Sequence, residues 1–202
     1  QILRVHFHFV EDLVTSGRHT RRDVWLDRLQ RGDIVGGAWT EGADSKLGTF
    51  STALAPRGDT LLLTGTKLYS TGSLFADWID VGAVDQKGDT ISAVVSARAP
   101  GVDLVDDWDG FGQILTGSGT TRFEDAPVDR NDVWTGEQRI GYSPAFYQTV
   151  HLATLSGIAR SAARDVARAV HARRRNFTHA AAALSKDDPQ VLQVVGKVFS
   201  RA

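Results

Sequence analysis

The run from Ala145 to Arg175 constrains the fold more than any other part of the sequence. It holds about 30 residues without a proline. A helix of that length spans roughly 45 Å, more than a β block of about 100 residues is expected to be wide. The apolar residues of this run recur at helical spacing: Phe146, Val150, Leu155, Ile158, Ala162, Val166 and Val170. Such a stripe needs further helices to pack against, from a longer chain or from a partner subunit.

The segment before this helix has the sequence pattern of a β domain. Short runs rich in Val, Ile and Thr are separated by the turn signals PRGD, QKGD and APGVD. The predicted strands are TFSTAL, TLLLTGTKLYS, DWIDVGAV, TISAVVSA and TTRFEDAPV. Closely spaced strands without intervening helices predict an antiparallel barrel or sandwich.

Helical patterns stand at both ends of the chain. Residues 1–31 predict two helices, the second with Thr20 as N-cap and Gly32 at its stop. A final helix is predicted after Asp188, with Pro189 in its first turn. We therefore expect an α+β, multi-domain chain: 1–32 as the end of a helical domain, 33–141 as the β domain, and 142–202 as the start of a helical bundle.

Composition narrows the classes of function. The sequence has no cysteine, which excludes disulfides, thiolate metal sites and thiol nucleophiles. Lys and Arg number 23 against 24 Asp and Glu, so neither nucleic acid nor a membrane surface is an expected partner. With no long apolar run, a cytoplasmic protein is expected. The chain has no Met and begins at Gln1, so we expect a piece of a longer protein, incomplete at both ends.

Conventional catalytic motifs are absent from the sequence. It contains no P-loop, GxGxxG, GxSxG or HExxH pattern. His6 and His8 would share a face, and could bind a metal, only if VHFHFV were a strand. The pattern favours a helix there, and no metal site is predicted.

Three segments within the β block share an unusual composition. They are GGAWTEGADS at 36–45, GTKLYSTGSLFADW at 65–78 and DDWDGFGQILTGSGTT at 106–121. Each combines flat aromatic rings, hydroxyls and glycines with little charge. Together they suit a flat, heteroatom-edged ring such as a flavin or a nucleobase. The alternative is that the glycines and hydroxyls only make turns and that the aromatics belong to the core.

These segments, and the order helix, β block, long helix, resemble the acyl-CoA dehydrogenase superfamily. TKLYSTGSLFADW and DDWDGFGQILTGSGTT are most similar to its flavin-dependent monooxygenase branch, typified by dibenzothiophene monooxygenase. The resemblance implies a β domain between helical domains, with flavin in the cleft. It implies reduced FMN delivered by a separate reductase, a flavin hydroperoxide, and oxygen transfer to a small-molecule substrate. It also implies a homo-oligomer, a dimer or tetramer.

The resemblance assigns roles to individual residues. The flavin ring would be bordered by Ala38, Trp39, Thr40 and Glu41, with Tyr69 and Thr71 beside it. Arg175 would bind the flavin phosphate, although the run Arg173 to Arg175 could equally be a solvated helix end. Leu74, Phe75 and Trp108 would line the substrate cavity. His6 would be the catalytic histidine on the oxygen-reacting side of the flavin, with His8 as a second candidate.

Two alternatives remain open at this stage. The first is an acyl-CoA dehydrogenase proper, which would hold FAD and use a glutamate base. The monooxygenases place a histidine in the same domain, and either residue would lie beyond Ala202. The second alternative is a non-catalytic β-barrel binding module, which would bind no flavin.

Overall fold

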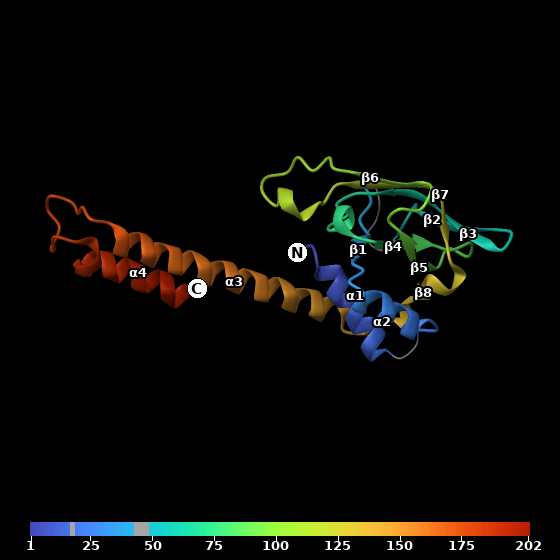
Figure 1. Ribbon diagram of the computed structural model, residues 1–202, viewed down its shortest axis with the longest axis horizontal. Coiled ribbons are helices and arrows are strands. Elements are labelled where there is room, and N and C mark those ends of the chain that lie inside the picture. The colour runs from blue at the N-terminus through green and yellow to red at the C-terminus, as the bar shows by residue number, and fades with distance from the viewer. Residues whose placement is uncertain (17–18, 43–48) are drawn as a thin grey trace. The chain divides into compact units, whose positions relative to one another are not determined.

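The computed structural model describes residues 1–16, 19–42 and 49–202. Residues 43–45, the end of the motif GGAWTEGADS, lie outside this part of the chain. The chain forms two compact units, Gln1–Tyr147 and Gln148–Ala202, whose elements are labelled in Figure 1. The predicted three-part division at residues 32 and 141 stays a prediction.

The strands of the first unit form one mixed sheet. Their bounds are β1 Val35–Ala38, β2 Ala53–Arg57, β3 Thr60–Lys67, β4 Trp78–Val84, β5 Thr90–Ser96, β6 Val102–Val105, β7 Thr120–Val128 and β8 Val133–Thr135. Hydrogen bonding gives the order β6-β7-β3-β2-β4-β5-β8, and β1 pairs with β4. The predicted fully antiparallel arrangement is wrong, because β1 and β4 run parallel, with Val35 opposite Trp78. Parallel neighbours need a long connection, and the chain from β1 to β4 supplies one that includes the β2–β3 hairpin.

The predicted strands are confirmed where their patterns were long. β7 alternates buried and exposed residues over most of its length, as a half-buried strand must. β4 and β5 are buried almost continuously and contribute Ile79, Val81, Ala93 and Val95 to the main core. The predictions missed β1, β6 and β8. These strands have only three or four residues each, too few to show an alternation of apolar and polar residues.

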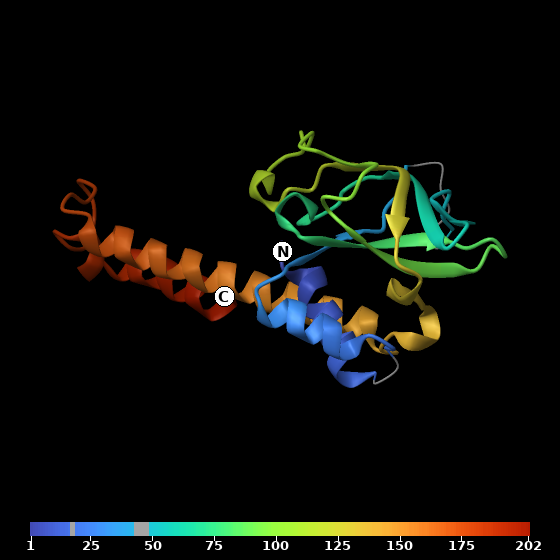
Figure 2. The same ribbon diagram turned by 45° about the vertical axis from the view of Figure 1, so that its right-hand side comes forward.

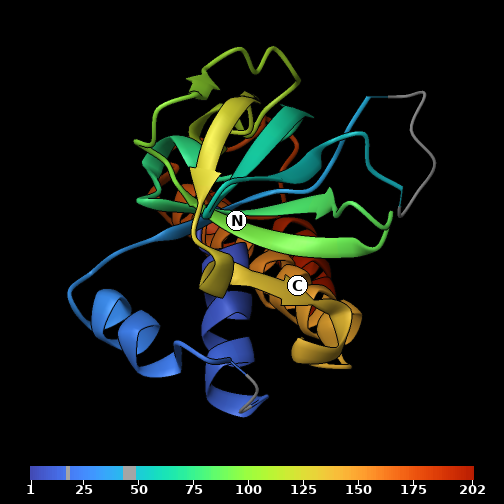
Figure 3. The same cartoon turned by 90° about the vertical axis from the view of Figure 1, so that its right-hand side faces the viewer.

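Two helices lie together on one side of the sheet, as Figures 2 and 3 show in blue. They are α1 Arg4–Thr15 and α2 Arg22–Gln30. The helix at VHFHFV is confirmed, but the N-cap of α2 is Arg21 rather than Thr20. Gly32 follows the end of α2 with a φ of 99°, a left-handed conformation that favours glycine.

A second apolar cluster joins these helices to the sheet. Its buried members are Phe9, Leu13, Trp25, Val35, Val94 and Trp134. The Trp25 indole donates to Asp132 Oδ1 at 2.9 Å, and the Arg28 guanidinium lies 4.4 Å from the Trp25 ring centre. The indole therefore both fills the core and satisfies a buried carboxylate.

Replacing Trp25 with phenylalanine is expected to lower the free energy of unfolding by about 2 kcal/mol. The smaller ring leaves a cavity and removes a hydrogen bond from the buried Asp132 carboxylate. Urea unfolding measures the loss. Trp108→Phe is the matched control, because its indole donates to Gly112 O in an exposed setting. Equal stability of the two variants would contradict this account of Trp25.

The second unit holds most of the long helix. α3 runs from Ser143 to Ala172 and α4 from Pro189 to Arg201. Asp188 is the N-cap of α4 as predicted, with Oδ1 accepting from Gln190 N at 2.9 Å. The arginine run expected at the end of the long helix lies beyond it, because α3 ends at Ala172.

Apolar side chains of α3 and α4 remain exposed in the described part of the chain. They include Leu152, Leu155, Ile158, Val194 and Phe199, each at least 47% exposed. This agrees with the expectation that the long helix needs further packing partners. Within residues 1–16, 19–42 and 49–202, no helix has the length and apolar character of a membrane span.

Candidate functional site

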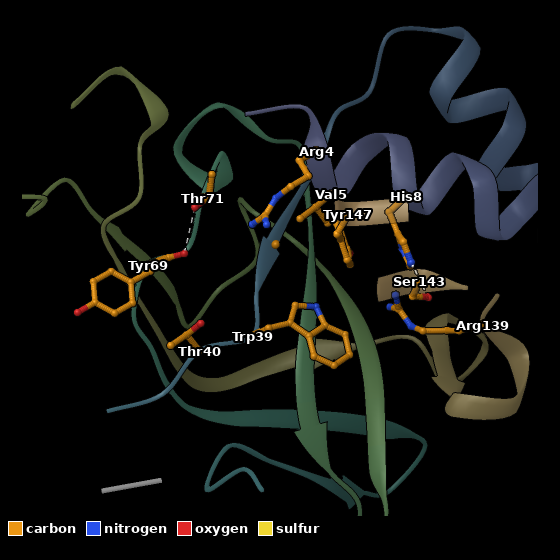
Figure 4. A pocket seen from close by; sticks show the side chains of 11 residues that line it. Arg4, Val5, His8, Trp39, Thr40, Tyr69, Thr71, Arg139, Ser143 and Tyr147 are labelled. Carbon is orange, nitrogen blue, oxygen red and sulfur yellow. Dashed lines mark hydrogen bonds between the residues drawn. The ribbon is translucent and has the colours of Figure 1, made fainter. Parts of the chain in front are cut away.

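A cavity of about 370 Å³ lies in the first unit, within the size range of small-molecule sites. Figure 4 shows Arg4, His8 and Tyr147 on one side of it and Trp39 and Thr40 on the other. Four segments that are far apart in sequence line it: Arg4, Val5 and His8; Gly37, Trp39 and Thr40; Tyr69 and Thr71; Arg139, Ser143 and Tyr147. Four residues predicted to contact a flavin thus come together here: Trp39, Thr40, Tyr69 and Thr71.

The two glycines of β1 place α1 at this cavity. A Cβ on Gly37 would lie 2.6 Å from Val5 Cγ2, and a Cβ on Gly36 would lie 2.8 Å from Ser73 Cα. Neither distance is compatible with a side chain, so glycine allows α1 and the connection after β3 to approach the strand closely. The GG pair in GGAWTEGADS therefore has a packing role.

The hydroxyl-rich connection after β3 reaches the cavity through only one of its hydroxyls. Ser70 and Ser73 are buried, and Ser73 Oγ donates to Gly37 O at 3.5 Å. Thr71 lines the cavity, with Oγ1 2.9 Å from Ser118 Oγ. Ser70 and Ser73 therefore lie inside the fold rather than in the cavity lining.

Tyr69 holds a backbone conformation that is rare for its residue type. Its φ is 55°, in the left-handed region where a bulky side chain is strained. Its ring is 57% exposed and meets the edge of Trp108 at 5.8 Å. Strain of this kind persists where the surroundings impose it and is frequent at ligand sites.

A buried ionic cluster, formed by Asp12, Asp80, Ser92 and Arg139, lies against the cavity. Arg139 Nη2 lies 2.7 and 2.6 Å from the two carboxylate oxygens of Asp80 and donates to Ser92 Oγ at 2.7 Å. Its Nη1 donates to Asp12 Oδ2 at 3.3 Å. Both carboxylates are fully buried. Sequence reasoning missed this cluster, although Asp80, in the middle of the apolar strand DWIDVGAV, was a signal that a buried acid needs a partner.

His8 connects this cluster to the cavity. Its Nε2 lies 2.8 Å from Ser143 Oγ and its Nδ1 lies 3.3 Å from Asp12 Oδ2. The imidazole stacks on Tyr147, with ring centres 4.6 Å apart. Burial, reinforced by Arg139, lowers the pKa of His8 to about 4, so the imidazole is neutral near pH 7.

Burial acts in the opposite direction on Asp12. It raises the pKa of this carboxyl to about 6, although Arg139 and the Ile140 N–H both lower it. Asp12 Oδ1 accepts from Ile140 N at 2.8 Å. Burial thus favours the neutral carboxyl of Asp12, while Arg139 and the Ile140 N–H favour the carboxylate.

Glu41 has a structural role in the described part of the chain. Its carboxylate accepts from Lys67 Nζ at 2.7 Å and from the backbone and hydroxyl groups of Ser51 and Thr52. Burial alone would raise the pKa of Glu41, but these donors hold it well below its usual range. It does not line the cavity.

Other predicted residues lie elsewhere. His6 is outside the lining as described, and its Nδ1 accepts from Val35 N at 3.2 Å. Leu74 and Phe75 lie near Gly117. Ala38 is buried in the core. Trp108 is not part of the described lining, and its ring centre lies 5.8 Å from that of Tyr69, which is part of it.

The cavity fits a flat ring with a polar edge. Trp39 and Tyr147 contribute aromatic rings to the lining, and Thr40 and Thr71 contribute hydroxyls. Arg175 lies in the second unit, after α3, where its carbonyl accepts from Arg173 Nε at 2.9 Å. Among the described residues, no three His, Asp or Glu side chains gather as metal ligands.

Comparisons with known proteins place this site in a known fold. No family model matches the sequence. The chain is 27% identical over 143 residues to the probable FMNH2-dependent monooxygenase SfnC of Pseudomonas putida. The alignment covers 67% of this chain and 36% of SfnC.

Two solved structures match nearly the whole chain. FMN-bound TdsC from Paenibacillus sp. A11-2 superposes with a TM-score of 0.85 at 22% identity, covering 99% of this chain and 54% of TdsC. Methanesulfinate monooxygenase MsuC from Pseudomonas fluorescens gives a TM-score of 0.84 at 20% identity, covering 98% of this chain and 52% of MsuC. The chain therefore shares the fold of TdsC and MsuC, and it spans about half the length of these structures.

Proposed function

We propose that this chain carries the flavin site of a reduced-FMN-dependent monooxygenase. The main support is the cavity, which is lined by Trp39, Thr71 and the buried His8. The fold that holds it is shared with FMN-bound TdsC. The relatives reported above are named for FMN or for monooxygenation, which favours FMN over FAD. Bound reduced flavin would supply the electrons for oxygen activation.

The residues at the cavity receive the following roles. Trp39 and Thr40 border the flavin ring, and Tyr69 and Thr71 lie beside it. His8 takes the role first assigned to His6, since His8 lines the cavity while His6 Nδ1 is held by a backbone amide. A neutral imidazole at the oxygen-reacting side can donate a hydrogen bond to a developing negative charge.

The remaining assignments are part of the same proposal. Arg175 binds the flavin phosphate, because a guanidinium suits phosphate geometry. Leu74, Phe75 and Trp108 line the substrate side. A separate reductase delivers reduced flavin, and the substrate is a small molecule with a soft or electron-rich atom such as sulfur.

The protein is also proposed to be a homo-oligomer in the cytoplasm. The exposed apolar residues of α3 and α4 support association. A dimer or tetramer would cover them, and sedimentation measures the mass directly. A monomer at micromolar concentration would contradict this part of the proposal.

Isotope labelling tests the activity. The chain is mixed with chemically reduced FMN and ¹⁸O₂, with dibenzothiophene and methanesulfinate as separate probes. We expect one labelled oxygen in the product of at least one probe, because a monooxygenase transfers one atom of O₂. The control contains reduced FMN, ¹⁸O₂ and the probe without the chain. If neither probe gains more ¹⁸O with the chain than in this control, the proposed function is contradicted.

A further inference from the structure

Two connections at the edge of the cavity are hydrogen-bonded to each other along their backbones. Ser70 N donates to Gly119 O at 2.9 Å, and Gly72 N donates to Thr116 O at 2.9 Å. These bonds continue the antiparallel pairing of β3 with β7 beyond the ends of the two strands. The side chains that the two connections carry therefore have defined positions relative to one another.

Three hydroxyls form a chain that leads from the cavity into these connections. Thr71 lines the cavity, and its Oγ1 lies 2.9 Å from Ser118 Oγ. Ser118 is buried, and its Oγ lies 2.7 Å from Thr116 Oγ1. Thr116 Oγ1 in turn donates to Gln113 O at 2.7 Å. The hydroxyl chain therefore begins at the cavity and ends on a backbone carbonyl.

The carbonyl at the end of the hydroxyl chain sets the direction of every hydrogen bond in it. A carbonyl oxygen only accepts, and each hydroxyl has one proton to donate. Because Thr116 gives its proton to Gln113 O, the proton between Thr116 and Ser118 comes from Ser118. Since the Ser118 proton is then in use, the proton between Ser118 and Thr71 comes from Thr71. Each hydroxyl thus donates away from the cavity.

The second contact of the Thr71 hydroxyl leads to the same result. Its Oγ1 also lies 3.3 Å from Tyr69 O, a contact that Figure 4 marks with a dashed line, and this carbonyl too can only accept. Thr71 therefore uses its proton within the protein and faces the cavity with a lone pair. If Thr71 donated into the cavity instead, Ser118 or Thr116 would have to turn away from its own acceptor, at the cost of a hydrogen bond.

We propose that Ser118 and Thr116 are positioning residues that hold the Thr71 hydroxyl as a hydrogen-bond acceptor toward the cavity. The cavity then prefers a ligand whose edge donates, and the proposed function supplies the identity of that ligand. Reduction of a flavin adds hydrogen to ring nitrogens that only accept in the oxidised form. A reduced ring can donate to Thr71, whereas a bare ring nitrogen would place one lone pair against another. The hydroxyl chain thus favours reduced over oxidised FMN.

The ratio of the dissociation constants of oxidised and reduced FMN tests this preference. It is measured for the unaltered chain, for Thr116→Val, which keeps the shape but lacks the hydroxyl, and for Thr116→Ser, which keeps the hydroxyl. The measurements with reduced FMN are made without oxygen. In Thr116→Val the Ser118 proton has only Thr71 to go to, so Thr71 is released to donate to the ligand. We expect the ratio to fall about tenfold in Thr116→Val, the contribution of one hydrogen bond, and to be retained in Thr116→Ser.

Thr64→Val is the matched control, because the Thr64 hydroxyl donates to Asp125 Oδ1 at 2.9 Å in an exposed setting. It should leave the ratio unchanged. A purely structural role of Thr116 would weaken the binding of both forms of FMN alike. An unchanged ratio in Thr116→Val, or an equal fall in Thr64→Val, would overturn the proposal.

Neutron diffraction tests the hydroxyl chain without any flavin. In crystals of the unaltered chain exchanged into D₂O, we expect the Thr71 deuteron to be directed at Ser118 Oγ and the Ser118 deuteron at Thr116 Oγ1. A Thr71 deuteron directed into the cavity, or a Ser118 deuteron directed at Thr71, would overturn the proposal. If the deuterons lie as expected and neither form of FMN binds, the proposed function alone is overturned.

Discussion

Replacing Arg139 with leucine is expected to lower the free energy of unfolding by about 3–5 kcal/mol. The substitution leaves the Asp80 carboxylate, which is fully buried, without its cation and takes a donor from Asp12. Removing one partner of a buried pair costs far more than the pair itself contributes, because the remaining charge is stranded. Urea unfolding at pH 7, followed by tryptophan fluorescence, measures the change.

Arg31→Leu provides the matched control for this experiment. Arg31 pairs with Asp27 at i and i+4 on α2, and both side chains are more than 60% exposed. Exposed pairs contribute at most about 1 kcal/mol. If Arg139→Leu destabilised the chain no more than Arg31→Leu does, the ionic cluster would not be a stabilising feature of the site.

Replacing Glu41 with glutamine is expected to cost a similar amount, about 3–5 kcal/mol. Lys67 is fully buried, its ammonium lies 3.9 Å from the Phe50 ring centre, and Glu41 is its carboxylate partner. A glutamine keeps the shape but removes the charge, so the lysine is stranded. The free energy of unfolding of this variant, measured against that of Glu124→Gln on the exposed face of β7, gives the effect.

The same variant has an expected dependence on pH. The folded chain lowers the pKa of Glu41 below its ordinary value of 4.5, so the carboxylate stabilises the fold fully above that value. The contribution is lost only as the pH falls below 4.5 toward the folded pKa. The difference between the unaltered chain and Glu41→Gln should therefore be constant from pH 7 to 5 and shrink in more acidic solution. A difference that vanished by pH 6 would contradict this account.

The sequence predicted those parts of the fold whose signals are local. The segments that form β4, β5 and β7 were long enough for their apolar residues to indicate buried strands. Asp188 and Pro189 marked the start of α4. The parallel pairing of β1 with β4 could not be predicted, because four residues, VGGA, carry no period. Their placement depends on the close approach of Val5 to Gly37, which is a tertiary contact.

The candidate site, too, could be predicted only where the signal was local in sequence. Composition singled out the segments at 36–45, 65–78 and 106–121, and the family resemblance assigned Trp39, Thr40, Tyr69 and Thr71 to the flavin. The ionic cluster was missed because Arg139 meets Asp80 across 59 positions and Asp12 across 127. Ser70 and Ser73 stand in the same hydroxyl-rich stretch as Thr71, yet burial and the bond from Ser73 to Gly37 O place them in the fold.

Reduced-flavin binding tests the central claim most directly. The chain is titrated with reduced FMN without oxygen, together with Thr40→Trp, which fills the cavity, and Thr66→Trp, an exposed control on β3. We expect Thr40→Trp to weaken binding at least about tenfold, equivalent to about 1.4 kcal/mol, and Thr66→Trp to bind like the unaltered chain. Equal affinity in all three chains, or no binding in any, would contradict a flavin site at this cavity.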